Sequence, residues 1–287
     1  MKISKLKNYL FLPIIILLVN FSTKYYILNP KGQIAFEQSK LIFVSFLIML
    51  IIVVPVILMS IIFLYKYSEK NYNHKNYKPN WDNSKNIEIV TWTVPIIIVF
   101  FLSIITWNST HKLDPYKPII SNTKTMDIEA ISLDWKWIFL YPKQNIASVN
   151  ELAIPINTPI HFIITSSSVM NSFFIPKLGS QMYAMAGMKT QLYLISNKPG
   201  IYTGFSSNYS GVGFSNMKFK VISCKNMNYF NKWLKKVRRS LNYLDAVNLM
   251  QESIPSIDHQ IEYFNKCESG LFNRLIDKFK NNKNNIY

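Results

Sequence analysis

Two long runs without a charged side chain limit what this chain can fold into. Residues 41–65 and residues 89–107 contain 25 and 19 uncharged positions in succession. Roughly 20 apolar residues in a helix cross the hydrocarbon core of a bilayer. Soluble core helices are rarely apolar on every face for this length. The sequence therefore predicts two membrane-spanning helices, over about 41–65 and 89–107, within a helical hairpin at 24–107.

Positive charges beside these runs predict how the hairpin is oriented. The loop over residues 66–88 carries five lysines: Lys66, Lys70, Lys75, Lys78 and Lys85. Short loops rich in lysine stay in the cytoplasm, so residues 108–287 are expected on the outer side. Residues 1–23 contain three lysines before a short apolar run, which is typical of a secretory signal or of a first membrane segment. No convincing cleavage site follows, and both alternatives stay open.

Composition excludes several other classes of protein. The net charge of +17 is spread evenly, with 11 basic and 4 acidic residues in 1–107, 10 and 5 in 108–224, and 11 and 6 in 225–287. Nucleic-acid binders gather such charge on one face, so no nucleic-acid partner is expected. An aromatic content of 15% excludes a disordered chain. Two cysteines are too few for a disulfide framework or a multi-cysteine metal module.

Residues 108–224 have the pattern of an all-β domain. Phe219 and Val221 alternate with Lys218 and Lys220, and similar alternation covers 160–165 and 191–194, where His161 and Thr165 fall on the wet face. Turn residues separate these runs. The pattern predicts an antiparallel sandwich or barrel.

Residues 225–287 form a C-terminal extension with helical periodicity. One apolar face is predicted from Phe230, Trp233, Leu234, Val237 and Leu241. A second comprises Leu271, Phe272, Leu275, Ile276 and Phe279. We expect these faces to pack on the sandwich or on a partner, with membrane-surface binding as the alternative.

Four segments carry a family resemblance, in order along the chain. They are residues 86–95 (NIEIVTWTVP), 134–142 (DWKWIFLYP), 169–179 (VMNSFFIPKLG) and 206–217 (SSNYSGVGFSNM). Together with the order of hairpin and β-domain, they resemble subunit II of the haem–copper oxygen reductases over roughly residues 30–222. The aromatic pairs at 263–264 and 271–272 extend the resemblance to the tail of its quinol-oxidising, bo-type branch. The resemblance implies a cupredoxin-like sandwich for residues 108–224.

The same resemblance shows which copper-binding residues this chain lacks. In the family's register, Ser206 and Ser210 stand at the two cysteine positions and Asn208 at the glutamate. Asn171 and Phe214 stand at the two histidines, and only Met217 is retained. Copper favours thiolate and imidazole ligands, so these positions are predicted to be vestigial and to bind no metal. Trp135, the electron-receiving tryptophan of copper-bearing relatives, is then interpreted as a packing residue.

The remaining cysteines and histidines do not suggest another metal site. Cys224 and Cys267 lie outside the copper loop, and their pairing stays open. His74, His111, His161 and His259 lack a ligand-type partner at short spacing. No cofactor is therefore expected in this chain.

The resemblance implies a role in a larger enzyme. It implies a non-redox structural subunit of a proton-pumping quinol oxidase in a bacterial inner membrane, with ubiquinol as substrate of the complex. The partners implied are subunit I, which would hold the haems and copper, smaller membrane subunits and the bilayer, but not cytochrome c. Glu88 aligns with the family's glutamate at a proton-channel mouth, although it could simply balance Lys85. Thr23 occupies the region of an acylated cysteine in many relatives, so lipidation there is not expected.

Two alternatives compete with this hypothesis. One is a membrane-anchored periplasmic binding or assembly module with no oxidase role. The other is subunit II of a cytochrome c oxidase, which would require copper in the external domain.

Overall fold

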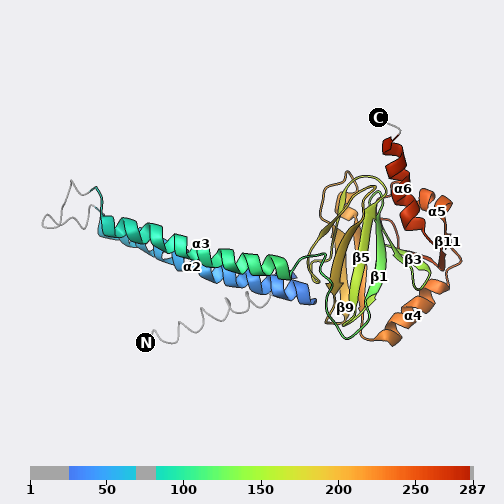
Figure 1. Cartoon of the computed structure of the whole chain (residues 1–287), viewed down its shortest axis with the longest axis horizontal. Coiled ribbons are helices and arrows are strands. Elements are labelled where there is room, and N and C mark those ends of the chain that lie inside the picture. The colour runs from blue at the N-terminus through green and yellow to red at the C-terminus, as the bar shows by residue number, and fades with distance from the viewer. Residues whose placement is uncertain (1–25, 69–81, 285–287) are drawn as a thin grey trace, which may run out of the picture. The chain divides into compact units, whose positions relative to one another are not determined.

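The described chain divides into two units. A computed structural model describes residues 26–68 and 82–284 (Figure 1). One unit is Lys40–Asp114, and the other combines Met1–Ser39 with Pro115–Tyr287. The signal-like segment at 1–23, most of the lysine-rich loop and His74 lie outside the described residues.

Two long helices contain the predicted membrane spans. They are α2, Gln33–Lys66, and α3, Lys85–Lys112, with Pro55 and Pro95 inside them. Both are long and apolar enough to cross a membrane. At about 1.5 Å per residue they measure roughly 50 and 40 Å, longer than a hydrocarbon core of roughly 30 Å. Their apolar side chains are exposed over almost the whole length, as suits contact with lipid.

The first turn of α2 is anchored to the β-domain within the second unit. The short 3₁₀ turn η1, Tyr26–Leu28, precedes it, and Ser39 donates to the carbonyl of Ile27 over 2.6 Å. Gly32 forms a bridge with Ser196, and the amide of Ala35 donates to the carbonyl of Leu178. A Cβ on Gly32 would lie 2.6 Å from the carbonyl oxygen of Ile195, so only glycine allows this approach.

The β-domain is a sandwich of two sheets. The first has the strand order β12-β3-β2-β1-β5-β8 and the second β4-β10-β9-β6-β7. The strands are β1 Met126–Ser132, β2 Trp137–Tyr141, β3 Ile146–Val149, β4 Glu151–Pro155, β5 Pro159–Ser166, β6 Asn171–Phe174, β7 Met182–Ala184, β8 Thr190–Ile195, β9 Gly200–Ser206, β10 Lys218–Cys224 and β12 Glu262–Phe264. The predicted cupredoxin-like sandwich is confirmed.

Two details of the strand prediction are wrong. The sheets are mixed, because β1 pairs with β5 and β4 with β10 in parallel. Thr165, predicted on the wet face, is fully buried, and its hydroxyl donates to the carbonyl of Met185 over 3.2 Å. A buried hydroxyl with a backbone acceptor incurs little desolvation penalty, so alternation alone misplaces it.

Strand β2 is buried on both faces. On the inner face Trp137 and Phe139 pack against Phe173 and Phe219, and the rings of Phe173 and Phe219 stack at 5.2 Å between centroids. Its outer face packs in a second apolar cluster with the C-terminal extension. The strand therefore needs a layer on each side.

The C-terminal extension supplies this outer layer, as Figure 1 shows on the β3 side of the sandwich. It comprises α4 Met227–Arg238, β11 Tyr243–Leu244, α5 Ala246–Glu252, β12, β13 Lys266–Cys267 and α6 Leu271–Asn284. Ile138 and Leu140 of β2 share a buried cluster with Phe264, Phe272 and Ile276. The predicted α4 face packs there as well, since Phe230, Trp233, Leu234 and Val237 are buried and the ring of Trp233 lies 5.3 Å from that of Tyr141 in β2.

Leu241 is an exception to the predicted α4 face. Its side chain is 94% exposed, because α4 ends at Arg238. Ser240 then donates to the carbonyl of Tyr263 over 2.6 Å, which turns the chain away from the helix axis.

A buried carboxylate joins the extension to the sandwich. Glu151 of β4 is 1% exposed and accepts hydrogen bonds from Trp233 Nε1 at 2.8 Å and from the hydroxyl of Tyr263 at 2.7 Å. Lys220 Nζ lies 3.4 Å away. Burial alone would raise the pKa of Glu151, but these hydrogen bonds and the charges of Lys220 and Lys236 outweigh it and lower the pKa.

We predict that Glu151→Gln destabilises the folded chain by about 1–3 kcal/mol, because hydrogen bonds to a buried charge are among the strong ones. The lowered pKa means that this contribution is present above the unfolded value of 4.5 and is lost as the pH falls through the folded pKa. The free energy of unfolding is measured by urea unfolding of the full chain in detergent, with tryptophan fluorescence as the signal, at pH values from about 3 to about 8.

Lys143→Gln is the matched control for this prediction. Lys143 pairs with Asp127 at 2.8 Å, but both side chains are exposed, so its loss should change stability by less than about 1 kcal/mol. Equal effects of the two substitutions, or a Glu151→Gln effect independent of pH, would contradict the prediction.

Candidate functional site

The residues at the predicted copper positions lie around one loop, between β9 and β10. Ser206 ends β9, Asn171 begins β6, and Met217 precedes β10. The loop carries Asn208 and Ser210, and Phe214 begins the short 3₁₀ turn η4, Phe214–Asn216. The fold thus brings Asn171 to the five positions within residues 206–217, at one end of the second sheet.

Hydrogen bonds between polar side chains fill the centre of this site. The hydroxyl of Ser206 donates to Asn171 Oδ1 over 2.9 Å and accepts from the amide of Ser172 over 3.3 Å. Asn208 Nδ2 donates to the carbonyl of Met170 over 3.1 Å. Asn171 is fully buried. Most of these groups are therefore satisfied by the chain itself.

The other positions serve packing. Met217 is fully buried, and its carbonyl accepts from the amide of Ser206 over 3.2 Å. The ring of Phe214 meets that of Tyr209 edge to face at 5.7 Å. Ser210 Oγ is buried without a hydrogen-bond partner among the described residues.

Trp135 fixes the loop from the side. Its Nε1 donates to the carbonyl of Ser210 over 3.0 Å, and its backbone adopts a positive φ of 68°. A Cβ on Gly213 would lie 2.4 Å from the indole, so glycine is needed at this contact. These contacts are those of a packing residue, as the sequence predicts.

The donor set of this site does not fit a dinuclear copper centre. Copper of this kind takes soft thiolates and imidazoles, whereas the six positions offer hydroxyls, amides, a phenyl ring and one thioether. Cys224 lies at the far end of β10 from Met217. Burial raises the pKa of the Cys224 thiol to about 11 and that of Cys267 to about 12, so both are protonated at neutral pH.

A second cluster lies beside the loop, and no sequence pattern predicts it. Lys136, which is 3% exposed, lies 3.1 Å from Glu252 Oε2 and 3.4 Å from His259 Nδ1. His259 Nε2 lies 3.1 Å from Glu262 Oε1. Glu252, His259 and Glu262 could hold a metal by proximity, but the Lys136 ammonium already supplies the positive charge.

The other candidate residues lie elsewhere. Glu88 is exposed in the first turn of α3, within the other unit. His161 stacks on Tyr193 at 4.4 Å and lies 3.2 Å from Asp127 Oδ1, and His111 is on α3. His161 thus lies on the first sheet, away from the loop, and Glu88 and His111 belong to the other unit.

Comparison with known proteins identifies the family. Residues 143–224 match the family model described as "Cytochrome C oxidase subunit II, periplasmic domain". The chain is 54% identical over 251 residues to cytochrome bo(3) ubiquinol oxidase subunit 2 of Buchnera aphidicola subsp. Baizongia pistaciae. The matched region covers 87% of each chain. This chain belongs to the subunit 2 family of bo-type ubiquinol oxidases.

More distant relatives of this oxidase subunit have the same kind of name. Ubiquinol oxidase subunit 2 of Acetobacter aceti is 48% identical over 89% of this chain and 83% of its own length. Quinol oxidase subunit 2 of Bacillus anthracis is 38% identical over 82% and 81%. The chain is therefore a membrane-bound subunit of a ubiquinol oxidase complex with a periplasmic domain, and the alternative of a module without an oxidase role is wrong.

We predict that restoring the missing ligands to this subunit creates a copper centre. The variant combines Asn171→His, Ser206→Cys, Asn208→Glu, Ser210→Cys and Phe214→His, and keeps Met217. After copper loading, the purified variant should be purple and show the electron-spin signal of a mixed-valence copper pair. The unaltered subunit should show neither.

The control variant keeps Ser206 and carries the other four substitutions. With one bridging thiolate it should not form the mixed-valence pair. A purple unaltered subunit would overturn our interpretation of the donor set.

Proposed function

We propose that this chain is the non-redox structural subunit of an oxidase that oxidises ubiquinol and reduces oxygen to water. The donor set at residues 171 and 206–217 carries the proposal, because without thiolates or imidazoles no electron relay operates in the periplasmic domain. Electrons then enter through subunit I, which would hold the haems and copper. The named relatives, which are quinol oxidase subunits, support the same assignment.

The charge of the β-domain supports a lipid-soluble donor. Residues 108–224 carry 10 basic and 5 acidic side chains, a sign that repels a basic protein such as cytochrome c. A quinol reaches the enzyme through the bilayer and needs no docking face in water. In this proposal the enzyme lies in a bacterial inner membrane with the smaller membrane subunits, and the β-domain supports subunit I.

We predict that the purified complex consumes oxygen with a soluble ubiquinol and not with reduced cytochrome c. The measurement is the rate of oxygen uptake with each donor, at equal concentrations of reducing equivalents. Cytochrome c-driven uptake at a comparable rate would contradict the proposed donor. Absence of haem from the complex would contradict the assignment of the redox centres to subunit I.

We further propose that Glu88 delivers protons from the cytoplasmic side. Its carboxylate lies in the first turn of α3, at the edge of an apolar span, and an ionisable group at such a position is a functional candidate. Among the described residues it forms no ion pair, with Lys85 or any other residue, that would give it a purely structural role.

We predict that Glu88→Gln slows ubiquinol-driven oxygen uptake several-fold without changing the yield of assembled complex. The amide keeps the size of the side chain but cannot carry a proton. Lys85→Gln is the control on the same helical turn and should leave turnover unchanged. Normal turnover of a fully assembled Glu88→Gln enzyme would remove this role.

A further inference from the structure

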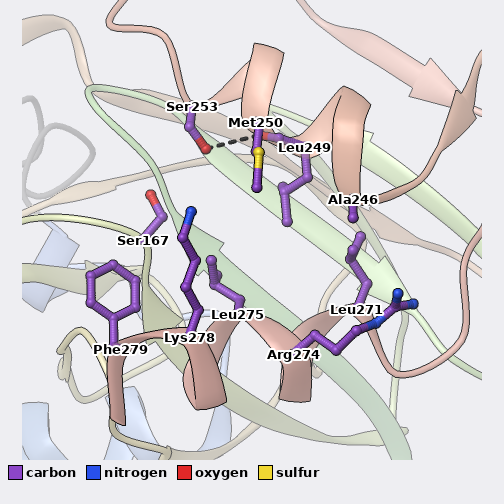
Figure 2. A pocket seen from close by; sticks show the side chains of 10 residues that line it. All are labelled: Ser167, Ala246, Leu249, Met250, Ser253, Leu271, Arg274, Leu275, Lys278 and Phe279. Carbon is purple, nitrogen blue, oxygen red and sulfur yellow. Dashed lines mark hydrogen bonds between the residues drawn. The ribbon is translucent and has the colours of Figure 1, made fainter. Parts of the chain in front are cut away.

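A groove between α5 and α6 has no role in the arrangement described above. It has a volume of about 310 Å³ and is shown in Figure 2. Leu249 of α5 and Leu271 and Leu275 of α6 form its apolar floor. Ser167, from the loop after β5, closes one side. This volume is at the lower end of the range for binding pockets. Because the groove is open along one side, a row of side chains from another molecule could enter it.

The outer face of α5 and the segment after it extend this apolar surface. Val247 and Met250 of α5 are 64% and 58% exposed, and Met250 also lines the groove. Their spacing of three residues places them on one side of the helix. Ile254, which lies just beyond the end of α5 at Glu252, is 65% exposed. Soluble surfaces seldom expose a row of large apolar side chains unless another molecule covers it. A ligand confined to the groove would leave Val247 and Ile254 exposed, so the occupant is larger.

The rim of the groove is basic. Arg274 lies toward one end and Lys278 toward the other (Figure 2). Arg274 pairs with Glu268 at 2.5 Å, whereas Lys278 has no ion-pair or hydrogen-bond partner among the described residues. An acidic partner would supply that charge. A second copy of this chain, at +17, is a poor complement.

The position of the groove on the sandwich favours a protein over a lipid. Ser167 follows the last residue of β5, while Pro159 at the other end pairs with Ile195, beside the Gly32–Ser196 bridge. Eight strand residues separate the two ends by roughly 25 Å. The groove is thus remote from the point where the chain leaves the domain for α2.

We propose that this groove docks an acidic amphipathic helix from another protein of the oxidase assembly. Apolar residues of that helix enter between α5 and α6, and its carboxylates face Lys278 and Arg274, in the manner of other helix-in-groove interfaces. The flexible, exposed side chain of Met250 suits such a contact. The identity of the assembly rests on the proposed function; the groove and its charge do not.

The test is photo-crosslinking in the assembled complex. p-Benzoylphenylalanine replaces Met250 or, in a second variant, Val247 of the full chain in native membranes. The same probe at Tyr229, which is 54% exposed on α4, is the control. We expect the two α5 probes, and not the control, to form an adduct with a co-purifying oxidase subunit, at a segment that mass spectrometry shows to be acidic and helically patterned.

A charge reversal makes the test specific. Lys278→Glu should lower the adduct yield by about fivefold, the factor that corresponds to about 1 kcal/mol. Lys278→Arg should preserve the yield, and so should Lys235→Glu on the exposed face of α4. Adducts with lipid only, with a second copy of this chain, or with no molecule at all would overturn the proposal.

Oxygen uptake in the same preparations separates the two proposals. A lost adduct with normal ubiquinol oxidation locates the fault in the groove proposal alone. A retained adduct in a complex that does not oxidise ubiquinol supports the groove and contradicts the proposed function.

Discussion

The unbroken apolar run of β2 determines how the periplasmic unit is built. Trp137 and Phe139 fill the aromatic centre of the sandwich, so Ile138 and Leu140 necessarily face outward. Leaving those two side chains in water would expose the middle of a sheet. The C-terminal extension covers them, and Glu151 holds that cover through hydrogen bonds from Trp233 of α4 and Tyr263 of β12. The extension is therefore part of the fold rather than an appendage.

Local patterns in the sequence predict the elements well and their partners poorly. The two spans, the strand alternation at Phe219 and Val221 and the helical faces of the extension follow from periodicity, which a short window contains. Parallel pairing of β1 with β5 and the cluster of Lys136 with Glu252 join residues far apart in the chain. No local signal encodes such pairs. The prediction for Leu241 is wrong for a related reason, since a hydrogen bond from Ser240 to the distant Tyr263 turns the chain away from the helix axis.

The copper-ligand positions follow from the resemblance to a family motif, and the structure adds what holds these residues together here. Ser206 and Asn171 bond to each other where the family would place a thiolate and an imidazole. The extension also reaches this loop, because Asn216 Nδ2 donates to Asp258 Oδ2 over 3.1 Å. The loop thus has support from the sandwich and from the C-terminal layer.

Closure of this loop by the chain's own hydrogen bonds affects how the subunit matures. A domain whose loop is closed by metal ligands completes its fold only after delivery of the metal, since binding and folding free energy are then the same quantity. Here serine and asparagine side chains close the loop as soon as the strands meet. Biogenesis of this subunit should consequently proceed at the same rate in copper-starved and copper-replete cells.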